Sequence, residues 1–151
     1  MVGDTDNDRE ARRQGESGHR TVPHTADVRV EAWGTTREHC LAEAALGLVE
    51  CFADASAAPT AAVERIRLAE GSDEELLTAL LEEVIYWLEV PGRVPVEVET
   101  DACDGGLEVR AALAEFADVE IIGAVPKGVS WHELRIGPGP YGWSCAVTID
   151  V

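Results

Sequence analysis

Apolar residues recur at two different spacings along this chain, and the order of those spacings constrains the fold more than any other feature. An apolar residue at every second position is typical of a β-strand with one buried face. That spacing is found at residues 28–32, 66–68, 94–98, 107–113 and 143–151, and Leu134 and Ile136 indicate a further strand. The strands are therefore expected to turn one face toward a shared core.

Two segments instead follow the helical spacing. Thr35 with Glu38, and Ser72 with Glu75, each fit a capping box, which predicts helices over roughly residues 36–53 and 73–89. Pro91-Gly92 ends the second helix. The expected buried stripes are Leu41, Ala45, Leu48 and Phe52 in the first helix, and Leu77, Leu80, Leu81, Val84 and Leu88 in the second.

The connections complete the expected fold. Residues 53–62 indicate a loop, 101–106 a turn and 137–142 a long turn, whereas 115–125 fit neither spacing. Because strands and helices do not alternate strictly, we predict an α+β fold with a mainly antiparallel sheet packed with two helices. We expect one domain over residues 19–151, preceded by a disordered polar leader over 1–18.

The charge of the chain limits its partners. The sequence holds 29 acidic and 12 basic residues, for a formal net charge of -17. Such a protein repels phosphate backbones, so tight direct binding of RNA or DNA is not expected. A basic protein partner or a cation fits this charge better, although acidity also serves simply to keep a small protein soluble.

The cysteines and the apolar runs indicate the compartment. The four cysteines show no CxxC spacing, so neither a zinc site nor a disulfide scaffold is indicated. No apolar run approaches the roughly 20 residues of a membrane span, and the polar N-terminus does not resemble a signal peptide. We expect a cytoplasmic protein that does not enter a membrane.

One lysine, Lys127, stands in a chain whose other eleven basic residues are arginine. Lysine carries a compact, strongly hydrated charge, whereas arginine presents a planar fork of donors. The choice of lysine at one position therefore favours a specific role there, although chance also produces such a singleton.

Two histidine-bearing segments could carry chemistry. His24 and Asp27 precede the first strand as a base with its partner or as metal ligands, or Asp27 binds local backbone N–H groups in a turn. Ser130 and His132 lie on one face of an apparent strand, but no GxSxG elbow surrounds Ser130. His132 is interpreted as a structural hydrogen bonder and Trp131 as sheet packing.

The last predicted strand, over residues 143–151, ends with negatively charged groups. Asp150 lies on the polar face of this strand, and the α-carboxylate of Val151 lies beside it. Adjacent anions are costly unless a positive charge lies close to them, and calcium or magnesium suits such oxygen ligands. Lys127 could supply that charge instead, or the strand end is simply solvated.

Three blocks together resemble the archease family. They are HTADVRVEAWG at 24–34, PKGVSWHELRI at 126–136 and WSCAVTIDV at 143–151, in the order in which that family has them. The middle block departs mildly from the usual KAVTYHEL, at Gly128, Ser130 and Trp131. Arg29 stands where glycine is common, and we expect it not to touch the site.

The resemblance implies an SHS2-like (strand-helix-strand-strand) archease fold and a chaperone-like, non-catalytic helper. Archeases activate the GTP-dependent tRNA-splicing RNA ligase, promoting its guanylylation and multiple turnover. Carried onto this chain, the resemblance implies a divalent metal site, calcium in the first place, formed by Asp27, Asp150 and an oxygen of Val151. It implies functional roles for Lys127, His24 and His132 beside that site.

Two alternatives of other classes stay open. One is a metal-dependent hydrolase that uses His24, Asp27, His132 and Asp150, although the chain has no HExxH motif. The other is an acidic interaction module without a metal.

Overall fold

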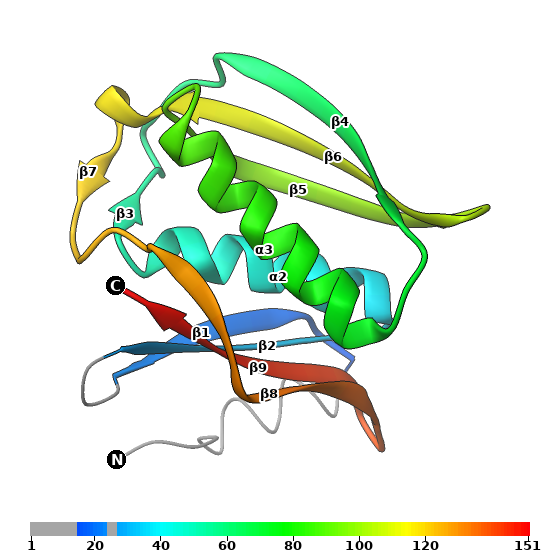
Figure 1. Ribbon diagram of the computed structural model, residues 1–151. Helices are drawn as coiled ribbons and strands as arrows, with labels where there is room; N and C mark the ends of the chain where they lie inside the picture. The colour runs from blue at the N-terminus through cyan, green and yellow to red at the C-terminus, as the bar shows by residue number, and fades with distance from the viewer. Residues whose placement is uncertain (1–14, 24–26) are drawn as a thin grey trace.

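The protein is built in three layers, with the helices between two antiparallel sheets (Figure 1). The computed structural model describes residues 15–23 and 27–151. Helices α2 (Arg37–Glu50) and α3 (Asp73–Glu89) each contact both sheets. The predicted α+β class with two helices is confirmed.

Strands from the two ends of the chain form the first sheet, and strands from its middle form the second. The first sheet has the order β1-β2-β9-β8, formed by β1 (Gly18–Pro23), β2 (Val28–Gly34), β9 (Gly142–Asp150) and β8 (Gly128–Gly139). The second has the order β4-β6-β5, formed by β4 (Ala62–Ala69), β6 (Gly106–Glu115) and β5 (Arg93–Cys103). A short pair, β3 (Ala53–Asp54) with β7 (Glu120–Ile121), follows the end of α2, and the 3-10 helix η1 (Phe116–Asp118) precedes β7.

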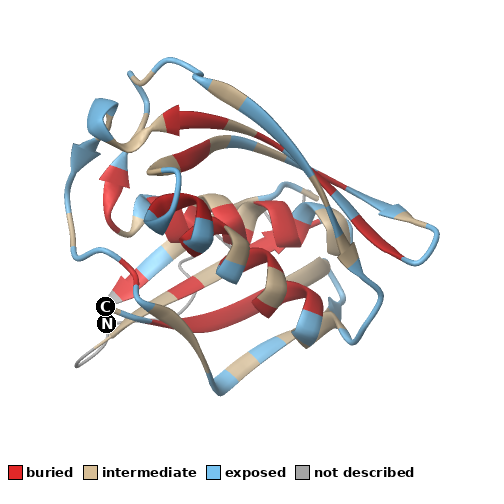
Figure 2. Ribbon diagram, turned by 45° about the horizontal axis from the view of Figure 1, so that its top comes forward, coloured by how far each residue is buried: buried red, intermediate tan, exposed pale blue. Residues whose placement is uncertain are grey.

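The core fills the space between the layers, and Figure 2 shows buried residues on the helices and on both sheets. The expected stripe of the first helix, from Leu41 to Phe52, is completely buried. On β9, Cys145, Val147 and Ile149 face the same core. Burying one such aliphatic side chain stabilises the fold by about 1.5–3 kcal/mol. The buried stripe of α2 and the core-facing side of β9 therefore help to hold the helical layer against the first sheet.

The caps confirm one predicted helix start and correct the other. At α3, the Glu75 N–H donates to the Ser72 hydroxyl over 3.1 Å, and the Ser72 N–H donates to the Glu75 carboxylate over 3.0 Å. At α2 the N-cap is Thr36, which accepts the His39 N–H over 3.1 Å. The expected cap at Thr35 is wrong by one residue, because the Thr35 hydroxyl instead contacts His39 Nδ1 at 3.2 Å.

The long turn expected at residues 137–142 is also wrong. Strands β8 and β9 continue through it, pairing Gly139 with Gly142 and leaving Pro140 and Tyr141 as the connection. The glycine and proline residues of this segment interrupt the alternation of apolar and polar side chains by which a strand is recognised in a sequence. They are tolerated here because β8 is an edge strand and Gly142 has a φ of 110°.

Strand β1, which periodicity did not reveal, is fastened to α2 by one histidine. His19 Nδ1 lies 2.6 Å from Glu43 Oε1, and its Nε2 contacts the Glu50 carboxylate. These carboxylates raise the pKa of His19, Glu43 first through its hydrogen bond, against the opposing effect of burial. The protonated imidazole also compensates a helix end whose last turn contains no basic residue.

The cysteines and the helices agree with a globular domain. No disulfide joins the four cysteines, which all lie among the described residues, and Cys40 and Cys145 are buried as small apolar side chains. In the part of the chain that the structure describes, no helix combines the length and the apolar character needed to cross a bilayer.

Candidate functional site

The register of the first sheet brings Asp27 and Asp150 to neighbouring strands. Strand β2 runs antiparallel to β9, and their last pair is Val28 with Ile149. Asp27 directly precedes that pair on one strand and Asp150 directly follows it on the other. Residues opposite each other on antiparallel strands have Cα atoms about 4.5–5.5 Å apart, so the two backbones meet at this end of the sheet.

Both aspartates belong to the face of the sheet that points away from the helices, here called the outer face. Val30, Val147 and Ile149 point into the core, so the residues that alternate with them belong to the outer face. Asp27 is half-buried and Asp150 is exposed. A Cβ built on Gly128, which pairs with Asp150, would lie 3.9 Å from Asp150 Oδ2. The Asp150 carboxylate therefore extends over Gly128.

Lys127 reaches the same end of the sheet through its backbone. Its N–H donates to the Asp150 carbonyl over 2.7 Å, which fastens the start of β8 to the end of β9. The Lys127 side chain is exposed, and among the ion pairs of residues 15–23 and 27–151 none involves it. The structure thus brings together Asp27, Lys127 and Asp150, while Val151 is half-buried against the core.

The carboxylates offer hard oxygen donors, but few of them. Among the described residues, no group of three or more His, Cys, Asp or Glu side chains is arranged to hold a metal ion. His24 lies outside the described residues. Calcium takes six to eight oxygen ligands. The described residues at this end of the sheet therefore supply too few oxygen donors to enclose such an ion.

His132 is separated from the aspartates by a bulge in β8. Ser130 pairs with Thr148 and Arg135 pairs with Ala146, so residues 131–134 oppose Val147 alone. Glu133 has a φ of 58°, which allows the extra residues to loop out of the ladder. The side chain of His132 is 83% exposed and Trp131 is 55% exposed. The interpretation of Trp131 as sheet packing is wrong, because alternation does not continue through the bulge.

Arg29 is the residue that the sequence interpretation missed. Its guanidinium donates to the Thr148 hydroxyl over 3.0 Å and to the Glu133 carbonyl over 2.8 Å. It thereby crosses the outer face from β2 over β9 to the bulge that carries His132. Neither contact is to an expected site residue, so the expectation that Arg29 does not touch the site stays a prediction. Its place on an alternating strand, two residues after Asp27, was the available signal.

Comparisons with known proteins agree on one family. Residues 19–151 match the model of the archease protein family (MTH1598/TM1083). The chain is 48% identical over 135 residues to "Probable protein archease" of Mycobacterium tuberculosis, covering 89% of this chain and 75% of that protein. It is 30% identical over 136 residues to "Protein archease" of Methanosarcina barkeri, covering 86% and 93% of the two chains.

Solved structures show the same fold at low sequence identity. The solution structure of Methanobacterium thermoautotrophicum protein 1598 superposes with a TM-score of 0.68 at 22% identity, covering 89% of this chain and 99% of that one. An archease of Thermotoga maritima, described as a possible chaperone, superposes with a TM-score of 0.64 at 18% identity, covering 86% and 94%.

Proposed function

The chain belongs to the archease family, and from that membership we propose that it is a non-catalytic accessory protein of the GTP-dependent tRNA-splicing RNA ligase. In this role it promotes guanylylation of the ligase and allows each ligase molecule to turn over repeatedly. The match over residues 19–151 supports the role, because it includes all three blocks on which the resemblance depends.

A divalent cation, calcium in the first place, is held by the carboxylates of Asp27 and Asp150 with a main-chain oxygen of Val151. The observation that carries this part is the register of β2 and β9, which brings two aspartates 123 positions apart in the chain to adjacent strand ends (150 minus 27). Two carboxylates on a solvent-facing sheet end supply charge and leave coordination positions for water. When bound, the cation would supply a positive charge that phosphate oxygens can share.

Lys127 acts beside this site. Its backbone is fixed to Asp150 while its ammonium group is exposed, so the charge is available to a partner. A lysine ammonium binds phosphate as a point charge. Lys127 therefore contacts a phosphate at the nucleotide site of the ligase.

The net charge of -17 agrees with a protein partner rather than with direct RNA binding. The basic partner is the ligase, which must itself hold RNA. His132 is exposed on the β8 bulge and so is available to that partner, and its role is to contact the ligase.

Guanylylation of the ligase from the same organism tests the proposal. Wild-type protein at substoichiometric amounts is expected to increase the guanylylated fraction and the number of ligations per ligase. Asp150→Asn and Lys127→Ala are each expected to remove most of that stimulation. Asp104→Asn, a matched change on the exposed turn between β5 and β6, is the control and keeps full activity. Full stimulation by both site variants would remove these residues from the mechanism.

A further inference from the structure

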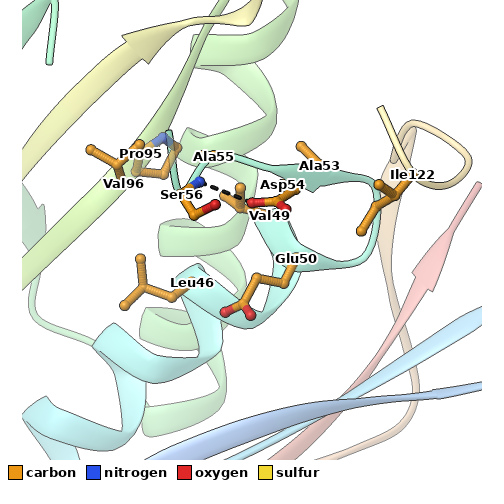
Figure 3. Close-up of a pocket in the computed structure, with 10 residues that line it drawn as sticks. All are labelled: Leu46, Val49, Glu50, Ala53, Asp54, Ala55, Ser56, Pro95, Val96 and Ile122. Carbon is orange, nitrogen blue, oxygen red and sulfur yellow. Dashed lines mark hydrogen bonds between the residues drawn. The ribbon is translucent and has the colours of Figure 1, made fainter. Parts of the chain in front are cut away.

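A hollow of about 490 Å³ lies between the last turns of α2, β3 with the loop that follows it, and the start of β5 (Figure 3). It contains none of the residues of the proposed cation site. Leu46, Val49, Pro95 and Val96 form apolar parts of its wall, and Glu50, Asp54 and Ser56 form polar parts. The hollow is therefore a second surface feature that the proposed function does not use.

Irregular backbone makes this space. The pairing of β5 with β6 shifts register between Pro95 and Glu97, so Val96 has no partner residue on β6. Figure 3 shows Pro95 and Val96 on one side of the hollow and Ile122 on the other. Ile122 is 57% exposed although its N–H is fixed to the Phe52 carbonyl. The hollow thus has an apolar rim that is open to solvent, with the Ile122 backbone bonded to Phe52.

The charge in the hollow is negative. Its charged lining residues are Glu50 and Asp54, and Glu50 is already bound to His19. Asp54 is exposed and is oriented by the Ser56 N–H, which donates to its carboxylate over 3.0 Å. Hydrogen bonds from Ser56 also lower the pKa of Asp54, which keeps it ionised.

We propose that this hollow receives an arginine side chain of a protein partner. The aliphatic stem lies against Leu46, Val49 and Val96, and the guanidinium pairs with Asp54. Arginine suits the site because its guanidinium is weakly hydrated and its planar donors match a carboxylate. A net charge of -17 steers a basic partner surface toward this protein. The inference holds for a partner protein of any activity and does not require the ligase role.

Two variants separate charge from shape. Asp54→Asn removes the charge but keeps an oxygen that can accept the Ser56 N–H. Ala55→Trp fills the hollow from its half-buried lining position. The matched controls are Asp104→Asn on the β5–β6 turn and Ala57→Trp, which is exposed in the same loop but does not line the hollow.

The test is an NMR titration of the protein alone with blocked arginine (N-acetyl-arginine-N-methylamide), with blocked norleucine as the neutral probe. We expect saturable shifts of the amides of Ala53, Ala55 and Val96 with arginine only. Asp54→Asn should weaken binding by about two- to fivefold, as for an exposed ion pair, and Ala55→Trp should abolish it. The proposal is overturned if the shifts scatter over the acidic surface, or if Ala55→Trp binds like wild type. Because no ligase is present, failure here leaves the ligase proposal standing, and the reverse also holds.

Discussion

At the residue scale, His19 shows how one side chain joins strand β1 to the helical layer. Both of its ring nitrogens contact carboxylates of α2, from Glu43 and Glu50. Thr21, two residues later on the same strand, contacts the thiol of Cys51 at 3.6 Å, and burial raises the pKa of that thiol. The Glu43 and Glu50 carboxylates raise the pKa of the imidazole above its ordinary value, so the charge of this contact depends on pH.

The contribution of His19 to stability should depend on pH. Because its folded-state pKa is raised, the stabilisation is complete below the pKa of an unfolded histidine, about 6.5, and is lost as the pH rises through the folded-state value. His19→Gln should therefore lower the free energy of unfolding by about 1 kcal/mol at acidic pH and by less at alkaline pH. Urea denaturation of both proteins at several pH values measures this difference. A constant difference across the pH range would show that the ion pairs carry no such stabilisation.

At the element scale, α2 approaches the first sheet closely at one glycine. A Cβ on Gly47 would lie 2.8 Å from Val30 Cγ1 and 3.2 Å from His19 Cβ. Gly47 is therefore kept inside a helix, where glycine normally costs about 1 kcal/mol relative to alanine, because the helix must lie against β1 and β2.

Gly47→Ala is expected to destabilise the protein by about 1–2 kcal/mol, since overpacking outweighs the gain in helix propensity. Val30→Ala removes the methyl group that blocks the new Cβ, and so serves as the compensating change. In thermal or urea unfolding, the double variant should lose less stability than the sum of the two single variants. Simple additivity would mean that Val30 does not limit the approach of α2.

Local sequence patterns predicted the helices and strands better than they predicted which distant segments contact each other. The buried stripe of α2 and the ends of α3 follow from periodicity and a capping box, which act over a few residues. The β8 bulge and the role of Arg29 depend on contacts between segments about a hundred residues apart, such as Arg29 with Glu133. Period-two alternation cannot reveal a place where four residues oppose one.

At the scale of the whole molecule, two helices separate two sheets, and one end of the first sheet collects residues from three parts of the chain. The resemblance suggested that Asp27, Lys127 and Asp150 act together, and the register of β2, β9 and β8 places them at that end. The hollow beside β3 could not be predicted from the sequence, because it forms where α2 and β3 meet β5 at a shift in the register of β5 against β6. The net charge of -17 favours positively charged ligands both at the strand ends of the first sheet and at the hollow beside β3.

A calorimetric titration with calcium tests most directly whether the strand ends of β2 and β9 form a cation site. Wild-type protein should bind one calcium ion per chain, and Asp150→Asn should weaken that binding by roughly tenfold or more, because ligand charge sets calcium affinity. Asp104→Asn should bind like wild type. Equal calcium binding by wild type and Asp150→Asn, or no binding by either, would contradict the proposed site.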